Sequence, residues 1–195
     1  MFSTTNQNEN QINASEVKLV GGDDNSTKHT LNIIPNKTTR TIAQMYLRIL
    51  QNSDNFVDDE TYQETKNSLY RYLTPKSEMK TLEQKLIEAD REELVEDALE
   101  LKEDTVKFIT MYEASNASRY ILVHILSTIA TKHKAYVIPA IKMKKPRDAI
   151  DAIIDNMVIE NALSILDGTG KSITTERMYG LMYYLAGNCH IKWTI

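Results

Sequence analysis

From residue 38 onward, apolar residues recur at the three- and four-residue spacing that is typical of helices buried on one face. The first helix is expected to begin at Thr38 or Thr39 and to end within residues 52–54. A second helix is expected to follow, with Asp58 or Asp59 as its N-cap. The predicted inward positions are Ile42, Tyr46, Ile49 and Leu50 in the first helix, and Tyr62, Leu69, Tyr70 and Leu73 in the second.

A third helix is indicated by its first residues. Thr81 and Gln84 have the spacing of a capping box, in which each side chain accepts a hydrogen bond from the other residue's backbone amide, and Ser77 is an alternative start. No Gly or Pro occurs from Ser77 to Ile138, so this helix is expected to run on, or to bend near Asp104 into a fourth. The apolar positions assigned to this stretch are Leu82, Leu86, Ala89, Leu94, Ala98, Leu101, Val106, Ile109, Tyr112, Ala117, Ile121 and Ile125.

The pattern changes after Lys134. Residues 136–138 are a short apolar run stopped by Pro139, which predicts an extended break inside the helical region. Pro146 suits the first turn of a helix, where its missing amide costs nothing. Because 12 of the 18 residues from 149 to 166 are apolar, this helix is expected to be buried on most sides.

The C-terminal part is predicted to hold one more helix and an extended tail. A glycine-containing turn over residues 167–170 precedes a helix that starts at Thr174 or Thr175 and is closed by Gly187. Apolar and polar residues then alternate over residues 190–195, which is typical of a short strand or extended segment.

Residues 1–37 differ from the rest, because Asn, Thr, Ser, Gln and Gly dominate them, and they are predicted to form a flexible polar arm. Residues 38–195 are predicted to form one helical core domain. A chain of 195 residues that is 42% hydrophobic and 26% charged can bury the core of one such domain. The predicted fold class is all-α, a single domain of about six or seven helices with at most a small strand pair.

Composition excludes several classes of protein. No run approaches the roughly 18 consecutive apolar residues of a membrane span, and the N-terminus is too polar for a signal peptide. We therefore expect a soluble, intracellular protein that is neither secreted nor embedded in a membrane. Cys189, the one cysteine, cannot form an internal disulfide or supply a cysteine-rich zinc site. Histidines at metal-site spacing are absent, so no metal and no cofactor are expected.

Charge is segregated along the chain. Residues 52–104 hold 16 acidic and 7 basic residues, whereas residues 105–195 hold 11 basic and 7 acidic ones. The acidic run is densest near the end of the first segment, where it indicates either a solvated helix face or an interaction surface. The acidic residues predicted to mediate self-association are Glu92, Glu96, Glu100 and Glu103.

The basic residues cluster around the predicted extended break. With Tyr136 as a stacking platform, they could line a groove for single-stranded RNA or DNA, or they could only keep a loop soluble. The predicted nucleic-acid-binding residues are Lys132, Lys134, Tyr136, Lys142, Lys144, Lys145 and Arg147. An acidic face on one copy could also meet a basic face on the next, which predicts a homo-oligomer built head to tail.

Other candidate sites have simpler explanations. Residues 167–172 end like a phosphate-binding loop, but Ile165 stands where that motif needs its first glycine, so a helix-to-helix turn is predicted instead. Acidic residues after Pro146, including Asp148 and Asp151, suit the positive end of a helix dipole and do not require a metal. The aromatic residues that either dock a partner or close the core are Tyr179, Tyr183, Tyr184 and Trp193.

No nucleophile, base and acid can be assigned together, so we expect no enzyme and identify no small-molecule substrate. The leading hypothesis is a structural self-assembling protein that coats single-stranded nucleic acid, as a viral coat or nucleocapsid protein does in a virion. The alternative is a helical protein–protein interaction or regulatory module, which binds one partner through the acidic third helix or the C-terminal aromatics.

Overall fold

The structure is a computed structural model that describes residues 37–52, 60–76 and 80–194. The chain divides into two units, residues 1–32 and 33–195, and every described residue belongs to the second. The predicted arm lies outside the described residues, apart from its last residue, Lys37, and so do the cap candidates Ser77, Asp58 and Asp59. The division into arm and core therefore stays a prediction.

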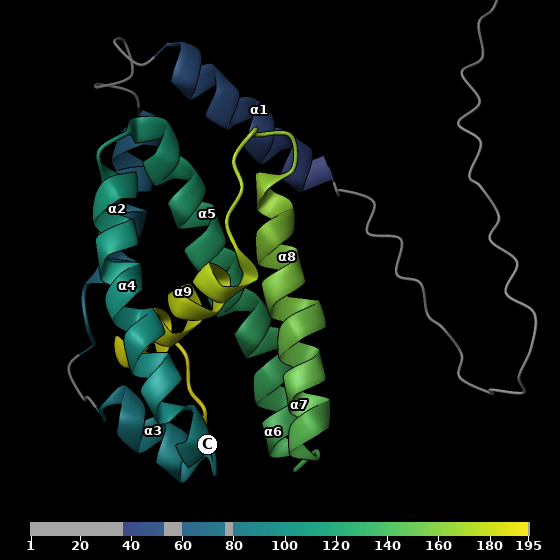
Figure 1. The fold of residues 1–195 in the computed structure, drawn as a ribbon. Coiled ribbons are helices and arrows are strands. Elements are labelled where there is room, and N and C mark those ends of the chain that lie inside the picture. Colours follow the sequence, from purple (N-terminus) through teal and green to yellow (C-terminus); the bar gives the residue numbers. More distant parts are fainter. Residues whose placement is uncertain (1–36, 53–59, 77–79, 195) are drawn as a thin grey trace, which may run out of the picture. The chain divides into compact units, whose positions relative to one another are not determined.

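The described residues are helical, which confirms the all-α prediction, and no strand occurs among them (Figure 1). Short 3₁₀ segments (η1, η4) and π-helical segments (η2, η3) join or extend the α-helices. In chain order the elements are α1 (Lys37–Gln51), α2 (Glu60–Leu73), α3 (Leu82–Glu88), η1 (Glu92–Leu94), α4 (Val95–Glu113), α5 (Asn116–Lys132), η2 (His133–Val137), α6 (Ile138–Lys142), α7 (Arg147–Ile153), η3 (Ile154–Ile159), α8 (Glu160–Leu163), η4 (Ser164–Leu166) and α9 (Thr175–Gly187).

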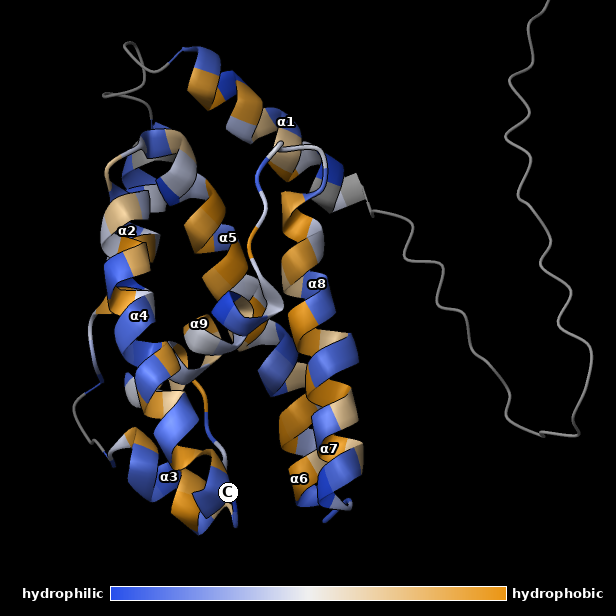
Figure 2. Ribbon diagram, viewed as in Figure 1, coloured by the Kyte–Doolittle hydropathy of each residue, from blue (hydrophilic) through white to orange (hydrophobic). Residues whose placement is uncertain are grey.

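Helix α5 forms the centre of the core. It packs against α1, α2, α4, α8 and α9, and most of its apolar side chains are buried. Hydrophobic residues accordingly run along α5, whereas α4 shows a largely hydrophilic face in the same view (Figure 2). The buried residues of α5 include Ile121, Leu122, Ile125, Leu126 and Ile129.

Side-chain caps start three of the helices. The predicted capping box of α3 is present, with the Gln84 amide 3.1 Å from Thr81 Oγ1 and the Thr81 amide 2.9 Å from Gln84 Oε1. Thr174 caps α9 as predicted, because its hydroxyl accepts from the Arg177 amide at 3.2 Å. Ser115 caps α5 in the same way. These caps satisfy amides that have no partner within the helix.

The expectation that the third helix runs on without a break as far as Asp104 is wrong. Helix α3 ends at Glu88, and the chain reverses through Asp90, whose φ is +58°. The Arg91 amide then donates to the Leu86 carbonyl oxygen at 2.9 Å, and this oxygen also accepts from the Ala89 amide at 3.1 Å. Aspartate adopts positive φ more readily than most residues, so no glycine is needed for this turn.

The predicted extended break at residues 136–138 is also wrong. Residues 133–137 form the π-helical segment η2, which continues α5 directly into α6. Pro139 lies in the first turn of α6, where a proline needs no amide partner. The real break is the turn between α6 and α7, where Lys144 has φ +52°.

Two further local expectations are corrected. Residues 191–194 of the tail form no strand, although Ile191 and Trp193 are buried. Leu50, Tyr70 and Val106, predicted to face inward, are exposed. Leu50 and Tyr70 lie at the edge of the apolar stripe of their helices, whereas Val106 lies on the outward side of α4. The buried helix after Pro146 is confirmed from η3 to η4, where Ile154, Val158, Ile159, Ala162 and Ile165 are buried, whereas α7 has no buried residue.

Helices α4 and α9 make the most extensive contact between elements, and Gly180 lies where they cross. A Cβ atom at Gly180 would collide with Thr105 Oγ1 and lie 2.8 Å from the Leu101 carbonyl oxygen. Only glycine therefore permits this close approach.

We expect Gly180→Ala to lower the free energy of unfolding by about 1–3 kcal/mol, because the two helices must separate. In an open helix the same change would raise it by up to about 1 kcal/mol. Gly187→Ala is the matched control, because its new Cβ would meet only the flexible end of Lys102. Urea denaturation measures both variants, and an equal effect of the two substitutions would contradict the packing argument.

Candidate functional site

Arg91 is a buried charged residue directly after the break that ends α3. Only 5% of its surface is exposed. Its guanidinium lies 2.5 Å from Asp151 Oδ1 on α7 and 5.1 Å from the centre of the Trp193 ring. Arg91 therefore joins the α3–η1 connection, α7 and the C-terminal segment through an ion pair and a cation–π contact.

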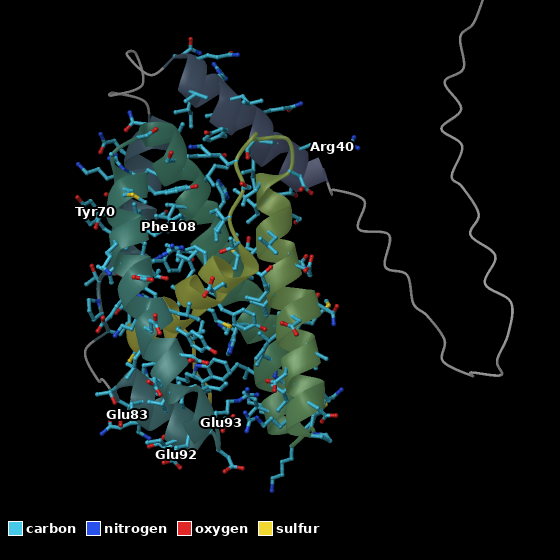
Figure 3. All side chains as sticks on the ribbon, viewed as in Figure 1. Arg40, Tyr70, Glu83, Glu92, Glu93 and Phe108 are labelled. Atoms are coloured by element: carbon cyan, nitrogen blue, oxygen red, sulfur yellow. The ribbon has the colours of Figure 1, made fainter. Side chains whose placement is uncertain are left out.

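Arg147 makes a second set of links between the same elements. It forms an ion pair with Glu93 of η1, and its Nη1 donates to the Asp90 carbonyl oxygen at 3.1 Å. Its Nε lies 3.9 Å from Asp151 Oδ2. Glu93 lies at the end of the hairpin formed by α3 and α4 (Figure 3).

Trp193 lies at the centre of an aromatic cluster. Its ring stacks on Tyr183, with centroids 6.3 Å apart, and meets His133 edge to face at 5.8 Å. Trp193 and Tyr183 are buried, and Tyr179 and Tyr184 are half-buried. Trp193 and Tyr183 therefore close the core, whereas Tyr179 and Tyr184 keep part of their surface exposed.

Two cavities flank Arg91, and both are lined by Arg91, Arg147 and Trp193. The α6-side cavity has a volume of about 360 Å³. The α9-side cavity has a volume of about 440 Å³. The α6-side cavity is also lined by Ile141, Lys145 and Ile150, and the α9-side cavity by Asp97, Asp151, Glu176, Tyr179 and Tyr183.

The acidic residues predicted for self-association lie together on one face. Glu92, Glu96, Glu100 and Glu103 are all exposed, and none forms an ion pair within the described part of the chain. They follow η1 and the outward side of α4, whose opposite side packs on α9. We call this surface the acidic face of α4. Its role in self-association stays a prediction.

The structure separates the predicted nucleic-acid-binding residues into two groups. Lys132 and Tyr136 lie near η2, where the Lys132 ammonium is 5.5 Å from the centre of the Tyr136 ring, and Lys134 is exposed nearby. The exposed lysines of the α6–α7 turn, here called the lysine turn, are Lys142, Lys144 and Lys145. Arg147 is engaged with Glu93 and is not available as a free cation of this cluster.

Two buried basic residues were not identified from the sequence. Arg91 is the one basic residue between Lys85 and Lys102, and this isolation inside an acidic run was the available signal. Lys85 is also buried; its Nζ donates to the Ala186 carbonyl oxygen and lies 3.0 Å from Cys189 Sγ. Lys85 thereby supplies a positive charge to the C-terminal end of α9.

The remaining motifs have structural roles. Gly168 and Gly170 adopt φ of +77° and +70° in the turn before α9, as predicted for a turn. Asp155 accepts a hydrogen bond from the Tyr179 hydroxyl. No three His, Cys, Asp or Glu residues in the described ranges are grouped so that they could hold a metal ion. Among the helices of those ranges, none has the length and apolarity needed to span a bilayer.

Residues 81–193 match the family model of C-terminal domain 9 (CTD9) of the ABC-three component (ABC-3C) systems. The match covers more than half of the chain, and the chain belongs to this family. No curated protein and no solved structure matches the chain.

Family membership indicates a protein–protein interaction or assembly component of a defence system and not a viral coat. The alternative hypothesis, a helical interaction module, is therefore better supported than the leading one. The capsid, virion and RNA-binding parts of the leading hypothesis have no support.

Asp151→Asn should destabilise the fold, because it leaves the buried guanidinium of Arg91 without its anionic partner. We expect a loss of about 1–3 kcal/mol in the free energy of unfolding, at the low end if water screens the pair. Asp148→Asn is the control, since Asp148 lies on the same helix and is exposed. Equal losses in the two variants, measured by urea denaturation, would exclude a special role for the pair.

His133 makes stability depend on pH. Burial lowers the pKa of His133 to about 4, from an ordinary value of 6.5. Between these values the unfolded chain binds more protons than the folded one, so stability falls as the pH is lowered through this range. The total loss is about 3 kcal/mol, and no further loss from this residue occurs below the lower value.

His133→Phe should remove this one-proton contribution. The difference in unfolding free energy between variant and wild type should be constant above about pH 7 and should shift in favour of the variant as the pH falls towards 4. Denaturant titrations across this pH range measure it. A pH-independent difference would show that His133 already titrates normally in the folded protein.

Proposed function

We propose that this chain binds a partner protein of its three-component system through the acidic face of α4. The observation that carries the proposal is the set of four exposed carboxylates on that face that have no ion-pair partner in the described part of the chain. Membership of the family supports an interaction role. Trp193 and Tyr183 are buried, so they do not present an exposed aromatic patch.

Apolar side chains interrupt these carboxylates. Leu99 is 38% exposed and Val106 is 48% exposed, and their spacing places both on the side of α4 that carries Glu96 and Glu103. Apolar contacts supply affinity when a partner covers them, whereas the carboxylates steer a basic surface into register. The partner surface is therefore basic with an apolar centre.

The test is the triple variant Glu96→Lys/Glu100→Lys/Glu103→Lys. We expect its affinity for the partner component of the same system to fall by at least about tenfold, and the wild-type affinity to weaken as salt is raised. Isothermal titration calorimetry with each of the other two component proteins measures this.

The matched control is Glu60→Lys/Glu64→Lys/Glu160→Lys, which makes the same charge change at exposed positions on α2 and α8. Its affinity should remain close to that of the wild type. An equal loss in the control, or binding that the triple variant leaves intact, would refute the proposal. Sedimentation of the chain alone tests the alternative that the acidic face of α4 binds a second copy of this chain through that copy's lysine turn.

A further inference from the structure

The α9-side cavity lies next to the acidic face, because Asp97 of α4 lines it. It is lined by two cationic residues and three carboxylates. Arg91 is paired with Asp151, and Arg147 is paired with Glu93, which lies outside this cavity. Asp97 and Glu176 remain as carboxylates without an ion pair in the described ranges.

Aromatic rings form part of the same wall. Tyr179, Tyr183 and Trp193 line the cavity, and the faces of such rings attract cations. Arg91 already uses this chemistry, because its guanidinium lies over the Trp193 ring while Asp151 neutralises it. The cavity volume of about 440 Å³ is within the range of about 300–1,000 Å³ that is typical of ligand sites.

The negative surroundings also act on the two phenols. Burial raises the pKa of Tyr179 above its ordinary value, and the hydrogen bond and charge of Asp155 raise it further. Burial is likewise the main cause of the raised pKa of Tyr183, to which the charges of Asp151 and Asp97 contribute against the opposing effect of Arg91. Both rings therefore remain neutral at physiological pH and keep the faces that a cation prefers.

We propose that the α9-side cavity receives an arginine side chain of the partner protein, with Asp97 and Glu176 as its counter-charges and the tyrosine rings as its walls. The proposal rests on the proposed function, since the same partner would cover the acidic face of α4. A guanidinium fits better than an ammonium because it can pair with a carboxylate and stack on a ring at the same time. A buried arginine of this kind is a common centre of binding energy in protein interfaces.

The experiment uses the full chain and two small probes. N-acetyl-arginine methylamide carries the guanidinium, and N-acetyl-citrulline methylamide has nearly the same shape without the charge. Trp193 is the only tryptophan of the sequence and lines the cavity, so its fluorescence reports on binding. We expect the arginine probe to bind about fivefold more tightly than the citrulline probe.

The variant Asp97→Asn/Glu176→Gln should abolish this preference. Both residues lie in the first turn of a helix, so Glu60→Gln/Glu83→Gln, which removes first-turn acids from α2 and α3, is the matched control and should retain the preference. Equal binding of the two probes to the wild type, no response to either, or an unchanged preference in the cavity variant would overturn the inference.

Measuring the affinity of each variant for the partner protein distinguishes a failure of this inference from a failure of the proposed function. The cavity variant should weaken partner affinity by about tenfold in addition to the effect of the α4 triple variant. Should the α4 variant weaken binding while the cavity variant does not, the inference is wrong and the proposed function stands. Should the α4 variant have no effect, the proposed function is wrong, whatever the probes do.

Discussion

The buried positive charge of Arg91 is the constraint on which the part of the domain around the two cavities depends. A guanidinium removed from water is costly unless an anion and hydrogen-bond acceptors surround it. Asp151 and the Trp193 ring meet that requirement, and they belong to α7 and the C-terminal segment. One side chain therefore fixes the relative positions of segments that lie far apart in the sequence. The two cavities are the spaces left on either side of it.

The lopsided charge of the sequence is partly used inside the fold. Arg147, from the basic half of the sequence, pairs with Glu93, from the acidic half. Exposed pairs of this kind contribute only about 0–1 kcal/mol, so this pair positions η1 against α7 more than it stabilises the domain. Among the described residues, unpaired charges remain on the acidic face of α4, in the α9-side cavity and on the lysine turn. Their positions depend on which charges pair inside the fold, so the net charge of either half of the sequence does not reveal them.

The family match begins at the N-cap of α3 and ends at Trp193. Helices α1 and α2 precede it, yet both pack on α5, with Tyr46 and Leu69 buried in the same core as the residues of the match. In this chain the segment before the match therefore covers apolar surface of α5 that would otherwise face water. The acidic face of α4 stays clear of these two helices and remains exposed.

Local patterns in the sequence determined the helical class, the cap at Thr81, the start of α9 and the buried run from η3 to η4, because spacing and capping act over a few residues. They could not locate the reversal at Asp90 or the continuous α5–η2–α6 helix, since neither a positive φ at aspartate nor a π-helical turn leaves a distinct pattern. Only the tertiary structure decided which charges are free. Arg147 and Glu93 look like surface charges in the sequence, and Arg91 is hidden within an acidic run, because pairing depends on distances between helices that are far apart along the chain.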